Sequence, residues 1–131
     1  MKIFVYGSLK RGYRNHRLLQ RSTFLGEAVT SDRYRMIDVG FPVLLGPTPD
    51  GHHVAGEVYE VDTTTLSALD QLESKGRMYD RVRKYVRMAT GESVRLYYYV
   101  GCEHAWSRRD YTSTRVQPTM AGVYHWNSTY T

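Results

Sequence analysis

The chain has 131 residues, of which 41% are hydrophobic and 24% charged, values typical of a globular domain rather than of a disordered tail or a membrane protein. Its net charge of +5 and 12 tyrosines would suit nucleic-acid binding, but no helix-turn-helix, zinc-finger or RNA-binding aromatic motif accompanies them, so we favour a solvated basic surface. The single cysteine, Cys102, excludes an internal disulfide and a cysteine metal cluster within the chain, and we expect a passive, partly buried thiol.

The N-terminal region combines a short strand pattern with a helical turn. Residues 2–6 form a β-prone run that stops at Gly7. Residues 15–20 have the pattern of one or two helical turns, with Leu18 and Leu19 facing inward. The first run is too short for the apolar core of a signal peptide, and we therefore expect a cytoplasmic protein.

The stretch GSLKRG at 7–12 predicts a turn that could bind an anion. Its glycines have the spacing of a Walker A loop, but Tyr13 and Arg14 stand where that loop needs lysine and serine or threonine. A dinucleotide fingerprint is excluded as well, because the spacing differs and no βαβ unit follows. What remains is a strand that ends in a turn with exposed backbone N–H groups, which suits a small anion such as a carboxylate.

The middle of the chain predicts a run of strands followed by one helix. The strand patterns and the turn between them cover residues 24–29, 34–39, 41–45, 47–51 (the turn) and 54–61. Asp62 is a good N-cap for a helix that continues to about Ser74 and is closed by Gly76.

The following segment predicts a β-hairpin. Residues 81–88 alternate between apolar and polar side chains, and the turn at 90–93 leads into a second strand at 94–100. Many strands, one helix and no βαβ repeat predict an α+β fold, a small twisted sheet curling toward a barrel, within a single domain over residues 1–131. We expect residues 104–131 to form an irregular, aromatic-rich C-terminal tail that packs through Trp106 and Trp126.

The predicted helix carries a carboxylate on its apolar side. Leu66, Leu69 and Leu72 form the apolar stripe, and Glu73 projects at nearly the same angle as Leu66. Two interpretations of Glu73 stay open. In the first, its carboxylate in the last turn is exposed to water or pairs with a neighbouring arginine. In the second, it lies at a partly dry pocket, where desolvation raises its pKa and makes it a general base near neutral pH. Asp70, one turn earlier, either tunes Glu73 by like-charge repulsion or faces solvent.

Three blocks of the sequence together resemble one protein family. They are VYGSLKRGYRNHRLL at 5–19, GEVYEVD at 56–62 and LDQLESKGRMYDR at 69–81. Their order and spacing are similar to the gamma-glutamylcyclotransferase-like superfamily, most of all to its gamma-glutamylamine cyclotransferase branch with the AIG2-like proteins. The resemblance covers about residues 1–100 and implies a compact, small mixed β-barrel with short helices, whose pocket receives the gamma-glutamyl part of a substrate.

The resemblance also implies roles for particular residues. The family's first motif, whose backbone groups hold the glutamyl moiety in relatives, corresponds here to Tyr6, Gly7, Ser8 and Leu9. The family's catalytic glutamate falls on Glu73, and a tyrosine that lines the pocket in the gamma-glutamylamine branch falls on Tyr79. This sequence departs from that branch at Ser8, where threonine is common, and in the residues between Glu73 and Tyr79, which bear on the choice of leaving group.

The implied activity is cyclisation of a gamma-glutamylamine or a related gamma-glutamyl compound. The products are 5-oxoproline and a free amine, Glu73 is the general acid and base, and neither a metal nor an organic cofactor is implied. The implied partner is a small molecule rather than a membrane or a nucleic acid. Two other classes stay open: a non-catalytic module that binds a small anionic metabolite in the same pocket, and a nucleic-acid-associated basic protein.

Overall fold

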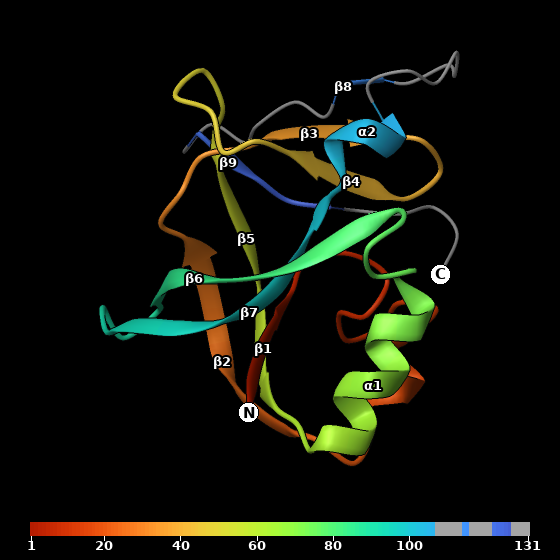
Figure 1. Ribbon diagram of the computed structural model, residues 1–131. Coiled ribbons are helices and arrows are strands. Elements are labelled where there is room, and N and C mark those ends of the chain that lie inside the picture. The colour runs from red at the N-terminus through yellow and green to blue at the C-terminus, as the bar shows by residue number, and fades with distance from the viewer. Residues whose placement is uncertain (107–113, 116–121, 127–131) are drawn as a thin grey trace.

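The computed structural model describes residues 1–106, 114–115 and 122–126, and its centre is a closed β-barrel (Figure 1). Strands pair in the order β1, β7, β6, β2 and β5, and β5 pairs in turn with β1. The pairs are antiparallel except β1 with β7, which is parallel. The barrel strands are β1 (Lys2–Val5), β2 (Thr23–Thr30), β5 (His53–Glu60), β6 (Tyr79–Met88) and β7 (Ser93–Gly101). The predicted small mixed barrel of the α+β class is therefore confirmed.

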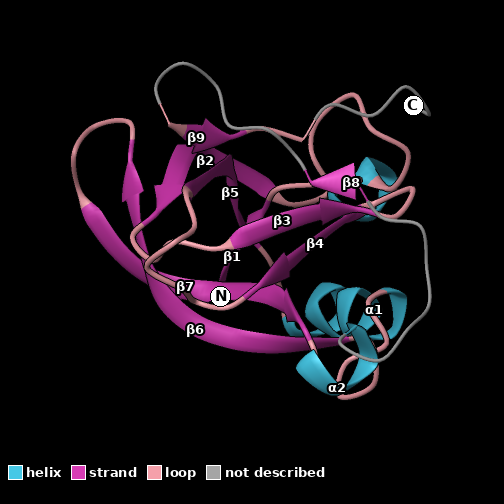
Figure 2. Cartoon of the chain, turned by 90° about the horizontal axis from the view of Figure 1, so that it is seen from above, coloured by secondary structure: helices cyan, strands magenta, loops and turns pink. Residues whose placement is uncertain are grey.

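A second, smaller sheet covers one end of the barrel (Figure 1). It consists of β4 (Pro42–Leu45), β3 (Arg35–Asp38) and β8 (Thr114–Arg115), in that order. A further short strand, β9 (Val123–Tyr124), lies parallel to the start of β5. The helices are short, and Figure 2 shows α1 (Thr63–Leu72) and α2 (Glu103–Trp106) on one side of the barrel. None of the described helices is long and apolar enough to cross a membrane.

Residues 3–5 of strand β1 are buried on both faces, which explains their uninterrupted apolar sequence. Phe4 points into the barrel and belongs to a core cluster with Val58, Val86 and Tyr98. Its neighbours Ile3 and Val5 point outward, where they join a second cluster beneath α1. The first strand therefore connects the two parts of the core.

Strands β6 and β7 form the antiparallel hairpin that the alternating sequence predicts. The strands pair from Tyr79 opposite Gly101 to Arg87 opposite Ser93. Val86 is fully buried in the barrel, whereas Arg87 beside it is exposed. A shift of the pairing by one residue would bring Arg87 inside and Val86 out, so this burial pattern favours the observed register.

Helix α1 begins as predicted and ends earlier than predicted. The Asp62 side chain accepts a hydrogen bond from the Thr65 backbone N–H at 2.7 Å, as expected of an N-cap. The helix stops at Leu72 because Ser74 adopts a left-handed conformation with φ 49°. Leu72 is 41% exposed, so its predicted place in the buried stripe is wrong: the last turn of the helix lies at the rim of a cavity rather than over the barrel.

The C-terminal segment is more regular than the sequence predicts where it is described. Besides α2, it contributes β8 and β9, each of two residues and therefore too short to leave a periodic pattern. Trp106 and Trp126 are 4% and 5% exposed, so the predicted packing through these side chains is observed. Cys102 is also buried. The rest of the predicted tail lies outside the described residues.

Closure of the barrel depends on close approach of β1 to Gly56 in β5. A Cβ atom on Gly56 would clash with the Val5 carbonyl oxygen and lie 2.7 Å from the Phe4 ring. Because a backbone oxygen in a closed barrel cannot move freely, we expect Gly56→Ala to lower the free energy of unfolding by about 3 kcal/mol. Urea denaturation measures this loss.

The neighbouring position provides the control for this prediction. Ala55 is only partly buried, and Ala55→Gly should cost about 0.5–1 kcal/mol through backbone entropy alone. A loss for Gly56→Ala no greater than that for Ala55→Gly would contradict the proposed close approach.

Candidate active site

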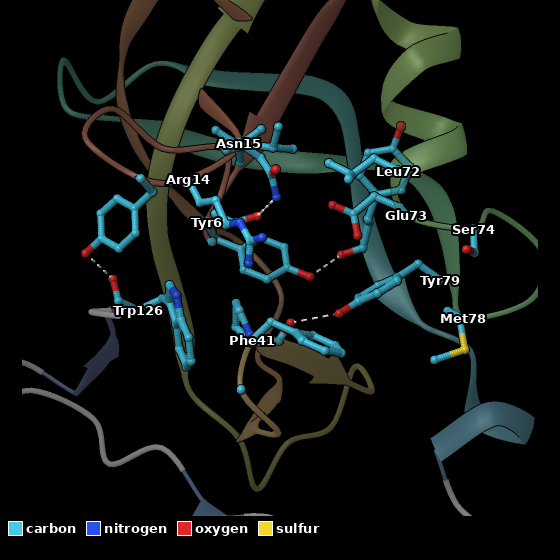
Figure 3. Close-up of a pocket in the computed structure, with 18 of the residues that line it drawn as sticks. Tyr6, Arg14, Asn15, Phe41, Leu72, Glu73, Ser74, Met78, Tyr79 and Trp126 are labelled. Atoms are coloured by element: carbon cyan, nitrogen blue, oxygen red, sulfur yellow. Dashed lines mark hydrogen bonds between the residues drawn. The ribbon is translucent and has the colours of Figure 1, made fainter. Parts of the chain in front are cut away.

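A cavity of about 320 Å³ opens between the turn after β1, the end of α1 and the smaller sheet (Figure 3). The residues that the sequence predicts for the site all line it: Tyr6, Gly7, Ser8, Leu9, Glu73 and Tyr79. They come from two separate segments of the chain that are brought together by the barrel and α1. The structure thus gathers the predicted site residues around one space.

The turn after β1 is fixed by hydrogen bonds that leave several N–H groups free. The Lys10 N–H donates to the Gly7 carbonyl at 3.0 Å, and Asn15 donates to Ser8 twice, from its backbone N–H to the carbonyl and from Nδ2 to Oγ, each at 2.8 Å. The backbone N–H groups of Gly7, Ser8 and Leu9 donate to nothing in the described part of the chain. Successive free N–H groups of this kind can hold an anion.

Glu73 lies directly after α1, and its side chain enters the cavity. Its backbone N–H donates to the Leu69 carbonyl at 3.0 Å, which continues the helical hydrogen bonding by one residue. Burial raises the pKa of the Glu73 carboxyl to about 7. Within the described ranges the carboxyl forms no ion pair, so the alternative of pairing with a neighbouring arginine is not observed.

A carboxyl group with these properties is suited to proton transfer. With a pKa of about 7 for Glu73, both the ionised and the protonated form are well populated at neutral pH. A group poised in this way can accept a proton in one step and return it in the next.

The structure supports neither of the two alternatives that the sequence left open for Asp70, repulsion of Glu73 or exposure to solvent. Its carboxylate accepts hydrogen bonds from the Tyr99 hydroxyl at 2.7 Å and from Arg81 Nη1 at 3.1 Å. The Arg81 guanidinium also lies 4.9 Å from the centre of the Tyr97 ring. These contacts tie the last turn of α1 to β6 and β7, and so determine where the helix delivers Glu73.

The two tyrosines in the cavity wall are engaged by backbone carbonyls. The Tyr6 hydroxyl donates to the Tyr99 carbonyl at 2.6 Å, and the Tyr79 hydroxyl donates to the Pro42 carbonyl at 3.0 Å (Figure 3). Burial raises the pKa of Tyr6 and of Tyr79 well above the ordinary value for a phenol. Both side chains are therefore neutral hydrogen-bond donors that hold the shape of the wall.

The structure adds wall residues that the sequence did not predict. They are Phe4, Val5, Tyr13, Arg14, Asn15, Gly40, Phe41, Pro42, Leu72, Ser74, Met78, Tyr99 and Trp126. Asn15 lies inside the first of the three family-like blocks and could have been found there. Phe41 follows a loop and Trp126 lies in the C-terminal segment, and no local pattern connects either of them with Glu73.

Trp126 is held in the wall from the N-terminal loop. Its carbonyl accepts hydrogen bonds from Lys10 Nζ at 2.8 Å and from the Tyr13 hydroxyl at 3.1 Å.

The described residues contain no group of three or more histidine, cysteine, aspartate or glutamate side chains arranged to hold a metal ion.

Comparisons with known proteins identify the family of the chain. The family model described as gamma-glutamyl cyclotransferase, AIG2-like, matches residues 3–115. The gamma-glutamylaminecyclotransferase of Bos taurus is 44% identical over 94 residues, which are 66% of this chain and 56% of that protein. The corresponding protein of Rattus norvegicus is 38% identical over 118 residues, or 79% of each chain.

A solved structure extends the similarity to the whole fold. The crystal structure of an AIG2-like protein from Mus musculus matches with a TM-score of 0.73 and 30% identity, covering 99% of this chain and 97% of that one. The chain therefore belongs to the gamma-glutamyl cyclotransferase, AIG2-like family, and the similarity predicted from three sequence blocks, including that to the gamma-glutamylamine branch, is confirmed.

The raised pKa of Glu73 predicts a cost in stability that depends on pH. An unfolded glutamate titrates near 4.3, whereas Glu73 in the folded protein has a pKa of about 7. Between these values the folded state keeps a proton that the unfolded state has released, so stability falls as the pH rises from about 4.3 to 7. The linked loss is about 4 kcal/mol.

Glu73→Gln should remove this loss because glutamine does not titrate. Relative to the parent, the variant should gain about 4 kcal/mol in unfolding free energy between pH 4 and pH 8, measured by urea denaturation. Glu92→Gln, which removes an exposed carboxylate in a hairpin turn, is the matched control. An equal pH dependence in Glu73→Gln and the parent would show that the carboxyl is not desolvated.

Proposed function

We propose that the protein cyclises a gamma-glutamylamine or a related gamma-glutamyl compound and releases 5-oxoproline and a free amine. The observation that carries the proposal is the buried Glu73 carboxyl, with a pKa of about 7, in the same cavity as a turn with free N–H groups. Membership of the cyclotransferase family supports the reaction class. The names of the bovine and rat relatives support a gamma-glutamylamine as the substrate.

The substrate contains its own nucleophile, the α-amino group of the glutamyl moiety. An α-amino group at a peptide N-terminus has a pKa of about 7.7–8.0, and the free α-carboxylate of the glutamyl moiety raises the pKa further. The amine is therefore largely protonated at neutral pH and must lose a proton before it attacks. In the proposed mechanism the Glu73 carboxylate takes that proton. A partly dry site strengthens this transfer because water does not compete for it.

Ring closure then follows from the atoms already present in the substrate. The free amine attacks the gamma-carbonyl carbon, and the new C–N bond closes a five-membered ring. As the original amide C–N bond breaks, protonated Glu73 returns its proton to the departing nitrogen. The ionised Glu73 carboxylate then passes the second proton of the ring nitrogen to the released amine, which leaves as an ammonium ion. The products are 5-oxoproline and the free amine, Glu73 is again ionised, and the sequence of steps uses neither a metal nor an organic cofactor.

The turn after β1 supplies the positioning in this proposal. The free N–H groups of Gly7, Ser8 and Leu9 would bind the carboxylate of the glutamyl moiety and stabilise charge on the attacked carbonyl. Tyr6 and Tyr79, fixed through their hydroxyls, would form the wall against which the glutamyl chain folds. Holding the amine next to the carbonyl lowers the barrier because the attack is intramolecular.

The proposal predicts that activity depends on the Glu73 carboxylate. Purified parent protein should release 5-oxoproline from at least one member of a panel of gamma-glutamyl amines and dipeptides, assayed by mass spectrometry. Glu73→Gln keeps the shape of the side chain and removes the base, so kcat should fall by roughly 10²–10⁴. Glu92→Gln should keep the parent rate.

The same assay separates catalysis from binding. If the parent releases no 5-oxoproline from any panel member but binds one in isothermal titration, the pocket binds a metabolite without turnover and the proposed enzyme activity is wrong. If Glu73→Gln turns over as fast as the parent, Glu73 is not the acid and base.

A further inference from the structure

The cavity carries one cation that the proposed chemistry does not use. Arg14 lines the cavity, and Figure 3 shows its side chain reaching inward from the N-terminal loop, on the side away from Glu73. Among the described residues that line the cavity, Arg14 is the only lysine or arginine and Glu73 the only aspartate or glutamate.

The Arg14 guanidinium has no partner in the described part of the chain. It takes part in no hydrogen bond, ion pair or ring contact there, whereas Lys10 donates to the Trp126 carbonyl at 2.8 Å and Arg11 lies 4.6 Å from the centre of the Phe24 ring. The raised pKa of Glu73 has burial as its cause, so Arg14 does not act on that carboxyl either. Its planar fork of N–H donors is free for a carboxylate from outside the chain.

Depth in the cavity indicates which part of a substrate would reach Arg14. Tyr6 and Leu9 are only 7% and 4% exposed, so they lie at the deep end. Arg14 is exposed, as are Phe41 at 42% and Leu72 at 41%, and these residues form the mouth. If the free N–H groups at the deep end hold the glutamyl carboxylate, the leaving amine points toward the mouth, where it meets two apolar side chains and one guanidinium.

We infer that Arg14 is a specificity-determining residue that binds a carboxylate on the leaving amine. The preferred substrates would then be gamma-glutamyl amino acids or peptides, in which the leaving amine carries a carboxylate. Gamma-glutamyl compounds whose leaving amine carries no carboxylate would be poorer substrates. This inference rests on the proposed function and names the substrate class within it. A leaving amine with a positively charged group beside Arg14 would be disfavoured by charge repulsion.

Two substrates of nearly the same shape test the inference. Gamma-glutamylglycine and gamma-glutamylglycinamide differ only in a terminal carboxylate against a neutral carboxamide. A charge-assisted contact at an exposed mouth should favour the first compound in kcat/KM by roughly three- to tenfold. Because the contact is exposed, 0.5 M NaCl should reduce this preference.

The variants for this test are Arg14→Gln and Arg17→Gln. Arg14→Gln should abolish the preference by raising KM for gamma-glutamylglycine, with little change for the carboxamide. Arg17 is exposed in η1 (His16–Leu19) and does not line the cavity, so Arg17→Gln should keep the parent preference. Arg14 makes no contact that folding needs, and circular dichroism should show an unchanged fold.

The outcomes distinguish this inference from the proposed function. The inference is overturned if the parent shows no preference, if Arg14→Gln keeps it, or if Arg14→Gln slows both substrates equally, which would place Arg14 on the glutamyl part. If neither compound yields 5-oxoproline, isothermal titration with the same pair decides: tighter binding of gamma-glutamylglycine that is lost in Arg14→Gln supports the contact, and equal binding overturns it.

Discussion

The pairing of β1 with both β5 and β7 is the constraint on which the site depends. Four residues, Lys2–Val5, complete the barrel, and they do so only because Gly56 leaves room for the β1 backbone. A strand held on both edges has a fixed end, so the turn that follows it is fixed as well. The free N–H groups of Gly7 and Ser8 thus belong to a rigid position rather than to a loose N-terminal loop.

Tyr99 connects the two halves of the site. Its backbone carbonyl accepts from the Tyr6 hydroxyl at the start of the turn, and its own hydroxyl donates to Asp70 in the last turn of α1. One residue of β7 therefore sets the distance between the turn and the helix end that carries Glu73. This arrangement costs free energy because it desolvates the Glu73 carboxyl. Apolar packing in the two core clusters of the barrel and α1 offsets that cost.

The sequence predicted the features that depend on local pattern. Alternation located the β6–β7 hairpin and the Asp62 cap located the start of α1, whereas helical periodicity left open whether Glu73 returns to water or lies at a pocket. It missed features that depend on contacts distant in sequence: Asp70 is bound by side chains from two strands, and Trp126 reaches the cavity through bonds from the N-terminal loop. The single-domain assignment and the cytoplasmic location stay predictions.

The pH dependence of kcat/KM tests the central claim, that Glu73 accepts the proton of the substrate amine, most directly. Only the ionised carboxylate can accept that proton, and burial raises the pKa of Glu73 to about 7. The rate with the best gamma-glutamyl substrate should therefore fall tenfold for each pH unit below about 7. A rate that stays constant down to the ordinary glutamate range, near pH 4.3, would contradict the account.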